Sequence, residues 1–180
     1  MVMKPFLLWP FLLAIIFPAI GQKYALEKST ITFFSDAVIE DISATNRKAG
    51  SILNTQTFEV VFSVPINEFQ FKKKLMREHF NEKYLESEKF PKSTFVGTIT
   101  GLNVATQGVQ SVSASGKLTI HGATNPVVIP GTAEMQAGKI SLKSKFVIRL
   151  ADYNITIPQL MWQNIAEQVE VTVDFTYKPQ

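Results

Sequence analysis

Hydrophobic and polar residues alternate with a period of two in about nine segments of this chain. The clearest segment is residues 169–177, where every odd position is apolar and every even position is polar or charged. Successive side chains of a strand point to opposite faces, so such a segment has one apolar face and one solvated face. Repeated through a single domain, the pattern predicts a curved antiparallel sheet around an apolar interior. A hydrophobic ligand would occupy that interior if the side chains leave room.

We expect strands over residues 24–35, 37–43, 49–54, 57–65, 94–104, 110–121, 127–135, 139–150 and 169–177. Residues 71–85 instead have helical spacing, with Leu75, Met76, Phe80 and Tyr84 on one side. Residues 45–48, 122–126 and 136–138 are expected turns, and 151–164 an irregular link. Because the connections are short, sequence neighbours should pair antiparallel. The predicted fold class is all-β with one helix, an extended up-and-down antiparallel barrel of about eight strands. A β-sandwich is the structural alternative.

Composition is typical of one folded domain, with 46% hydrophobic and 18% charged residues among 180. Fourteen phenylalanines suit a dry interior, since their rings carry no polar group. The chain has no cysteine, so a lipoprotein anchor is not available to it. Without Lys4 the net charge falls from +3 to +2, which is too small to indicate nucleic acid as a partner.

The first 21 residues have the features of a secretory signal peptide. Lys4 is their only charge, residues 6–17 form a short apolar run, and small residues precede Gln22. An uncleaved anchor is the alternative. We therefore expect a signal peptide over 1–21, cleaved near Gly21–Gln22, and a single barrel domain over 22–180 in the periplasm or outside the cell.

The sequence contains few residues that could form a metal site or a catalytic site. The only histidines are His79 and His121, whereas a zinc site takes three or four ligands. We expect His79 beside the apolar side of the helix, and His121 at a strand end, bonded to the turn backbone. There is no nucleophile elbow, and adjacent Glu40 and Asp41 would point apart in a strand. We predict no catalytic residues, no metal and no required cofactor.

A run of three lysines, residues 72–74, is the densest basic segment. It is read either as a solvated helix start or as a site of attraction for an anionic membrane surface or a pyrophosphate group.

Three motifs together resemble the YceI-like family of periplasmic lipid-binding proteins. They are residues 75–80 (LMREHF) leading into 84–95 (YLESEKFPKSTF), residues 116–124 (GKLTIHGAT) and residues 146–155 (FVIRLADYNI). Their order and spacing also resemble the family over nearly all of the chain after the leader. The resemblance implies a lipocalin-like barrel holding a long isoprenoid chain, with the polar head near the mouth, and secretion to the periplasm. Asn154 departs from the family, which often has Gly there; Asn tolerates left-handed backbone angles better than most residues.

The apolar faces of the expected strands and helix supply the candidate ligand contacts. These are Phe58, Val60, Phe62, Met76, Phe80, Phe95, Ile99, Leu118, Ile120, Val127, Ile129, Ile140, Leu142, Phe146, Ile148, Val171, Val173 and Phe175. At the mouth, Asp152, Tyr153, Asn154 and Trp162 are expected to orient a polar head group. Periodicity alone does not distinguish a lined cavity from a filled core, and the resemblance favours the cavity.

The functional prediction is a secreted, non-enzymatic carrier or reservoir for a long isoprenoid or quinone-like lipid, bound by apolar burial. One alternative is an outer-membrane β-barrel with its apolar face turned outward. The other is an enzyme acting on a lipid inside the barrel, which predicts that His79 or His121 reaches the cavity. The sequence leaves open the identity of the lipid, a homodimer and transient contact with a membrane surface.

Overall fold

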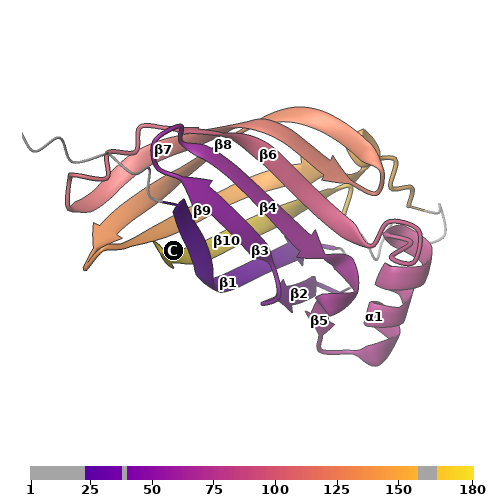
Figure 1. Cartoon of the computed structure of the whole chain (residues 1–180). Coiled ribbons are helices and arrows are strands. Elements are labelled where there is room, and N and C mark those ends of the chain that lie inside the picture. The colour runs from indigo at the N-terminus through magenta and orange to yellow at the C-terminus, as the bar shows by residue number, and fades with distance from the viewer. Residues whose placement is uncertain (1–22, 38–39, 158–165) are drawn as a thin grey trace, which may run out of the picture.

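The computed structural model describes residues 23–37, 40–157 and 166–180. The expected signal peptide over 1–21 and Trp162 lie outside these ranges. Within them, ten strands form one sheet that closes on itself (Figure 1). The strands are β1 (Lys23–Ser35), β2 (Ile42–Asn46), β3 (Gly50–Asn54), β4 (Glu59–Pro65), β5 (Gln70–Phe71), β6 (Lys92–Thr100), β7 (Gly108–Ile120), β8 (Ala123–Gln136), β9 (Lys139–Arg149) and β10 (Gln168–Pro179).

Eight of these strands form a closed barrel rather than a sandwich. Its order is β1, β3, β4, β6, β7, β8, β9 and β10, and β10 pairs back with β1. Every pairing is antiparallel. The remaining strands form a flap, in which β2 pairs with the second half of β1 and β5 pairs with β2. The predicted up-and-down barrel of about eight strands with one helix is confirmed.

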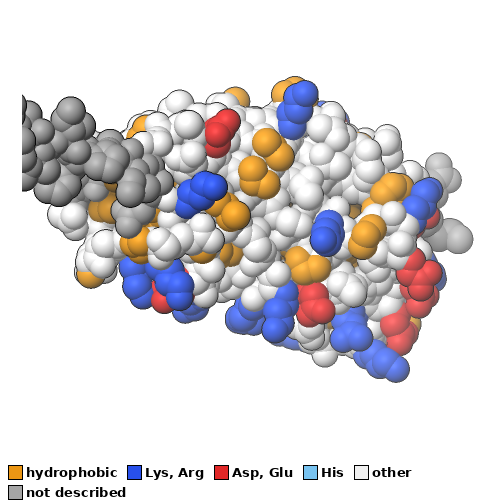
Figure 2. All heavy atoms as spheres, in the orientation of Figure 1, with side chains coloured by type: hydrophobic (Ala, Val, Ile, Leu, Met, Phe, Trp, Pro, Cys, Tyr) orange, Lys and Arg blue, Asp and Glu red, His pale blue; other side chains and the backbone are white. Residues whose placement is uncertain are grey.

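The apolar face of each barrel strand points inward. One end of the barrel is filled by large side chains, which include Leu53, Tyr177 and the cross-strand partner of Tyr177, Ile140; all three are fully buried. The outer face carries charged residues of both signs with apolar side chains scattered among them (Figure 2). Burial of the alternating apolar positions therefore stabilises the closed sheet from inside.

Residues 74–84 form the helix that lies at the other end of the barrel (Figure 1). It begins as α1 (Lys74–His79) and ends as a π-helical turn, η2 (Phe80–Tyr84), in which the N–H of Leu85 donates to the carbonyl of Phe80 at 2.9 Å. The helix starts later than the predicted residue 71 because Gln70 and Phe71 pair with β2. Two short 3-10 turns, η1 (Ile66–Glu68) and η3 (Leu150–Tyr153), complete the described elements. No helix in the described ranges is long and apolar enough to cross a bilayer.

The second strand lies further along the chain than the sequence predicts. The sequence places a strand at 37–43 and a polar turn at 45–48, but β2 spans Ile42–Asn46, with Thr45 and Asn46 paired to β1. The buried side chain of Asn46 donates to the carbonyl of Pro65 at 2.7 Å. This bond satisfies an amide that the polar pattern assigns to solvent.

The turn between β7 and β8 is tighter than the predicted turn at 122–126. It consists of His121 and Gly122, whose φ angles of +49° and +75° lie in the left-handed region. A two-residue type I′ hairpin requires positive φ at both positions, and histidine is among the residues that adopt it most readily. β8 therefore begins at Ala123, ahead of Pro126.

β8 and β9 pair over only part of their length and then separate. Their ladder ends at Gly131 and Ser144, although β8 starts at residue 123 and β9 continues to 149. Ser144 Oγ donates to the carbonyl of Pro130 at 2.6 Å, so this carbonyl faces β9. In an antiparallel strand the N–H of the same residue faces the same way, and proline has none. Pro126 has the same orientation, so the ladder cannot continue along this edge.

Candidate functional site

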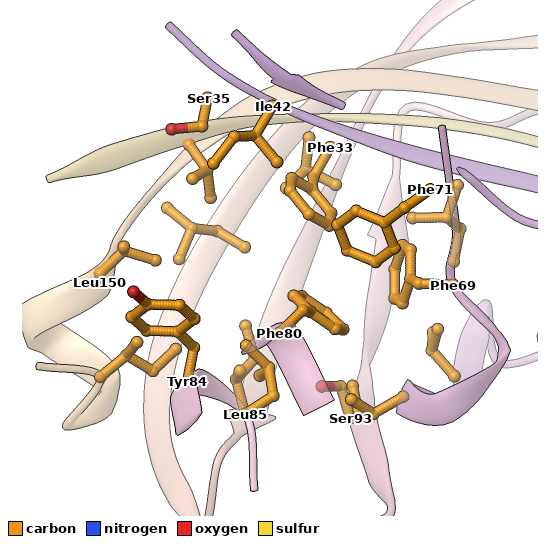
Figure 3. Close-up of a pocket in the computed structure, with 18 of the residues that line it drawn as sticks. Phe33, Ser35, Ile42, Phe69, Phe71, Phe80, Tyr84, Leu85, Ser93 and Leu150 are labelled. Carbon is orange, nitrogen blue, oxygen red and sulfur yellow. The ribbon is translucent and has the colours of Figure 1, made fainter. Parts of the chain in front are cut away.

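The end of the barrel beneath the helix encloses a cavity of about 380 Å³. Its walls come from β1, β4, β6, β7, β9 and β10 of the barrel, from residues 66–71 and from the helix. Nearly all of the lining side chains are aliphatic or aromatic (Figure 3). The interior is therefore hollow at one end and filled at the other.

Four phenylalanines fix the helix to the barrel and form one wall of this cavity (Figure 3). The ring of Phe80, on the helix, stacks on Phe33 of β1 with centroids 5.4 Å apart. Phe69 and Phe71 contact the same two rings at centroid distances of 5.0–5.8 Å. Such contacts add to the stabilisation from buried area. The cluster joins three segments that are separate in sequence.

The helical stripe predicted from the sequence faces the cavity. Leu75, Met76, Phe80 and Tyr84 all border it. Leu75 is 60% exposed, so it marks the side on which the cavity opens to solvent. The helix therefore forms both a wall and part of the rim.

Few polar groups border the cavity, and two of them, Glu40 and Ser35, form hydrogen bonds with other groups of the protein. The carboxylate of Glu40 accepts from Lys73 Nζ at 2.6 and 2.7 Å, in an exposed ion pair between the chain before β2 and the start of the helix. Ser35 Oγ accepts from the N–H of Ala166 at 3.0 Å. Burial raises the pKa of Tyr84, so its hydroxyl stays neutral at physiological pH.

Half of the candidate contacts border the main cavity. They are Phe62, Met76, Phe80, Leu118, Ile120, Phe146, Ile148, Val171 and Val173. A second, smaller cavity of about 70 Å³ is bordered by a further six, Val60, Phe95, Ile99, Ile129, Leu142 and Phe175. It shares Phe62, Phe146 and Val173 with the first.

Three candidate contacts border neither cavity. Phe58 occupies the turn before β4 with a φ of +56°. Ile140 is fully buried in the filled end of the barrel. Val127 lies on the part of β8 that has separated from β9. Inward direction along a strand therefore does not decide which side chains meet empty space.

The three predicted mouth residues within the described ranges do not line either cavity. Tyr153 is buried, and Asn154 ends η3 in the left-handed conformation expected from its sequence, with a φ of +56°. Their neighbours Leu150 and Ile155 border the main cavity instead. Asp152 is exposed, and its carbonyl accepts from Asn125 Nδ2 at 2.6 Å. Orientation of a head group by these side chains stays a prediction, and Trp162 lies outside the described residues.

Several lining residues were not singled out by the sequence pattern. Phe69 and Phe71 alternate with Gln70, which is a strand signal, but three residues are too few to stand out from a loop. Ile31 and Phe33 lie two residues apart on one face of β1, and this alternation could have identified them as lining residues. Leu85 follows the helical stripe and borders the cavity where the helix ends.

The two histidines have different surroundings. His79 borders the main cavity, as the alternative of a lipid-directed enzyme predicts for one of them. His121 instead contacts Glu86 and the backbone of Tyr153. Among the described residues, no group of three or more His, Cys, Asp or Glu side chains could hold a metal ion.

Comparisons with known proteins agree with this architecture. The sequence matches the family described as the YceI-like domain over residues 23–177. Among solved structures, it is similar to a polyisoprenoid-binding domain from Saccharophagus degradans implicated in plant cell wall breakdown, with 16% identity over 87% of this chain and 98% of the other, and a TM-score of 0.75. BcnA from Burkholderia cenocepacia has 17% identity over 82% and 95%, with a TM-score of 0.69.

A YceI protein from Campylobacter jejuni is similar at 12% identity over 74% of this chain and 80% of the other, with a TM-score of 0.56. No curated protein sequence matches the chain. At these identities the solved structures establish the fold and leave residue roles to be argued from the cavity itself.

Proposed function

Because the chain belongs to the YceI-like domain family, we propose that it is a non-enzymatic carrier or reservoir for a long isoprenoid or quinone-like lipid. The observation that carries the proposal is the hollow, apolar half of the barrel, about 380 Å³ in volume. Ligand pockets in proteins span about 300–1,000 Å³, so this cavity is large enough for a specific guest. Its lining offers almost no polar partners, which favours a hydrocarbon over a polar molecule.

Apolar burial supplies the driving force for such a guest. Each buried methylene is worth about 0.8 kcal/mol before the costs of ordering the chain are subtracted. An apolar cavity of this kind is poorly suited to water, because the lining cannot replace water's hydrogen bonds. The description of the Saccharophagus degradans relative as a polyisoprenoid-binding domain supports an isoprenoid as the guest.

The proposed route of entry is the rim beside the helix. Leu75 borders the cavity and is 60% exposed, and the neighbouring Lys74 side chain is 87% exposed. An apolar and a basic group side by side suit transient contact with an anionic membrane surface. Release into the periplasm or outside the cell rests on the leader-like sequence of residues 1–21.

The test is lipid uptake by variants that fill the cavity. Val171 lines the cavity, so Val171→Phe places extra volume where the guest would lie. Val128 is 71% exposed, so Val128→Phe makes the same change on the outside. Native mass spectrometry after incubation with farnesol should show one lipid per chain in the wild type and in Val128→Phe, and none in folded Val171→Phe. Equal uptake by both variants, or none by the wild type, would contradict the proposal.

An enzyme remains the second candidate function because His79 borders the cavity. If the protein is a carrier, a bound lipid should stay chemically unchanged over long incubation, both with the wild type and with His79→Ala. A product formed by the wild type and not by His79→Ala, detected by mass spectrometry of extracted lipid, would favour the enzyme.

A further inference from the structure

The main cavity and the second cavity meet at three shared side chains. Phe62, Phe146 and Val173 border both spaces, and they come from β4, β9 and β10. The second cavity is otherwise closed toward the filled end of the barrel by residues that include Phe175 and the fully buried Tyr177. The three shared side chains therefore form a floor between a large space and a small one.

Phe62 is held in this floor from behind. Its ring stacks on Phe95 with centroids 5.0 Å apart and planes 13° from parallel, and meets the edge of Phe175 at 5.9 Å. Phe95 is itself fully buried and lies against Gly97 and Gly116, which are paired in β6 and β7. A Cβ on either glycine would come within 2.6–2.9 Å of the Phe95 ring. The missing side chains thus make room for the ring that supports Phe62.

The space beyond the floor exists because small residues face it. Gly131 and Ser144 are paired at the point where the β8–β9 ladder ends, and both border the second cavity. A Cβ on Gly131 would lie 2.5 Å from the carbonyl oxygen of Lys143, so this position stays without a side chain. Ala114 borders the same space from β7. The second cavity is therefore built into the barrel wall at this level.

From this geometry we infer that Phe62, Phe146 and Val173 set the length of apolar chain that the protein holds. The inference rests on the proposed lipid-binding function and adds the specificity of the same site. A chain entering beside the helix extends through the main cavity until its end meets these three side chains. Units beyond that length remain at the open rim in water and gain no burial.

The volumes give the expected length. A dry cavity of about 150 Å³ binds benzene, with its six carbons, so a cavity of about 380 Å³ holds roughly fifteen carbons, or about three isoprene units. On the same scale the second cavity, about 70 Å³, holds roughly three more carbons. Removing the two terminal methyl groups of Val173 would join the spaces, and the combined gain is about one isoprene unit.

A matched pair of valine variants tests this assignment. Val173→Ala opens the floor, whereas Val128→Ala makes the same change on the outer face of the barrel, where Val128 is 71% exposed. The probes are the linear prenols from geraniol to geranylfarnesol, which differ by one isoprene unit at each step. Their affinities are measured by displacement of an apolar fluorescent dye.

In the wild type and in Val128→Ala, affinity should rise at least tenfold with each unit up to farnesol and change less than threefold beyond it. In Val173→Ala the rise should continue to geranylgeraniol. Phe146→Leu trims the same floor and should move the limit in the same direction, which keeps the test available if Val173→Ala does not fold.

An identical limit in Val128→Ala, Val173→Ala and Phe146→Leu would overturn the assignment while leaving lipid binding intact. A wild-type affinity that keeps rising at every added unit would overturn it as well. Failure of the folded wild type to bind any of the prenols would instead contradict the proposed function, and with it this inference.

Discussion

The Nε2 atom of His121 lies 2.7 Å from the Glu86 carboxylate, which ties the β7–β8 turn to the chain that follows the helix. Its Nδ1 atom lies 3.3 Å from the carbonyl oxygen of Tyr153 in η3. Both partners are hydrogen-bond acceptors, so a ring N–H of His121 donates in either contact. The ring of Phe90 packs edge-on against the imidazole at 4.6 Å. One side chain thus fastens three segments near the helical end of the barrel.

Removing the negative charge from this contact should lower the stability of the fold measurably. Glu86→Gln removes the charge that faces His121, and we expect the free energy of unfolding to fall. The expected loss is only about 1 kcal/mol, because the Glu86 side chain is partly exposed. Glu88→Gln, two residues further and exposed, is the control and should change it by less than half as much. Urea denaturation measures both. Equal effects would show that the contact with His121 contributes nothing specific.

A second prediction concerns the buried hydroxyl pair at the filled end. Ser51 Oγ donates to the carbonyl of Val61 at 2.8 Å, so its lone pair accepts from the Tyr177 hydroxyl at 2.6 Å. Ser51→Ala leaves the tyrosine hydroxyl buried without its partner, at a cost of about 1–3 kcal/mol. Tyr177→Phe leaves Ser51 bonded to Val61 and should cost only about 0.5–1.5 kcal/mol. A larger loss in Tyr177→Phe than in Ser51→Ala, by chemical denaturation, would reverse the assigned direction of donation.

The same tyrosine makes stability depend on alkaline pH. Burial raises the pKa of Tyr177 well above its ordinary value of 10.0. The unfolded chain therefore releases this proton near pH 10 while the folded chain keeps it, and stability falls above that pH by up to about 1.4 kcal/mol per pH unit. The stability advantage of the wild type over Tyr177→Phe should shrink between about pH 9 and pH 11. A constant difference over that range would argue against the buried, protonated hydroxyl.

Two glycines allow a test of the packing behind Phe62. In Gly116→Ala the new methyl group would meet the carbonyl oxygen of Val96 and lie 2.9 Å from the Phe95 ring. We expect a loss of at least about 2 kcal/mol in the free energy of unfolding, in the upper range for overpacked cores. Gly50→Ala is the matched control, since nothing lies within 4 Å of its added methyl group. Similar thermal stability for the two variants would contradict the close packing of Phe95 on Gly116.

The fold was predictable because alternation is a local signal. The odd positions of β10, from Val171 to Tyr177, point inward as the sequence indicates, and short connections give the antiparallel order. The elements whose bounds differ from the prediction do so because they pair with segments elsewhere in the chain. Asn46 joins β2 because β1 lies beside it, and the helix loses its first turn because Phe71 pairs with Ala44.

The candidate site was predictable only in part, because periodicity gives direction and not volume. Val171 and Ile140 both point inward, yet one borders the main cavity and the other is packed solid. Phe69 reaches the cavity from the position just before β5, a two-residue strand too short to produce a pattern. Glu86 lies 35 residues before His121, so no spacing rule links them.

The most direct test of the account is methyl NMR of the protein titrated with farnesol. The account predicts that the methyl signals of Leu118, Ile120 and Val171, which line the hollow half, shift as the prenol is added. The methyl signals of Leu53 and Ile140, which are buried in the filled half, should shift no more than those of a surface residue such as Val128. Shifts spread equally over both halves, or confined to the outer surface, would contradict a lipid held in the hollow end of the barrel.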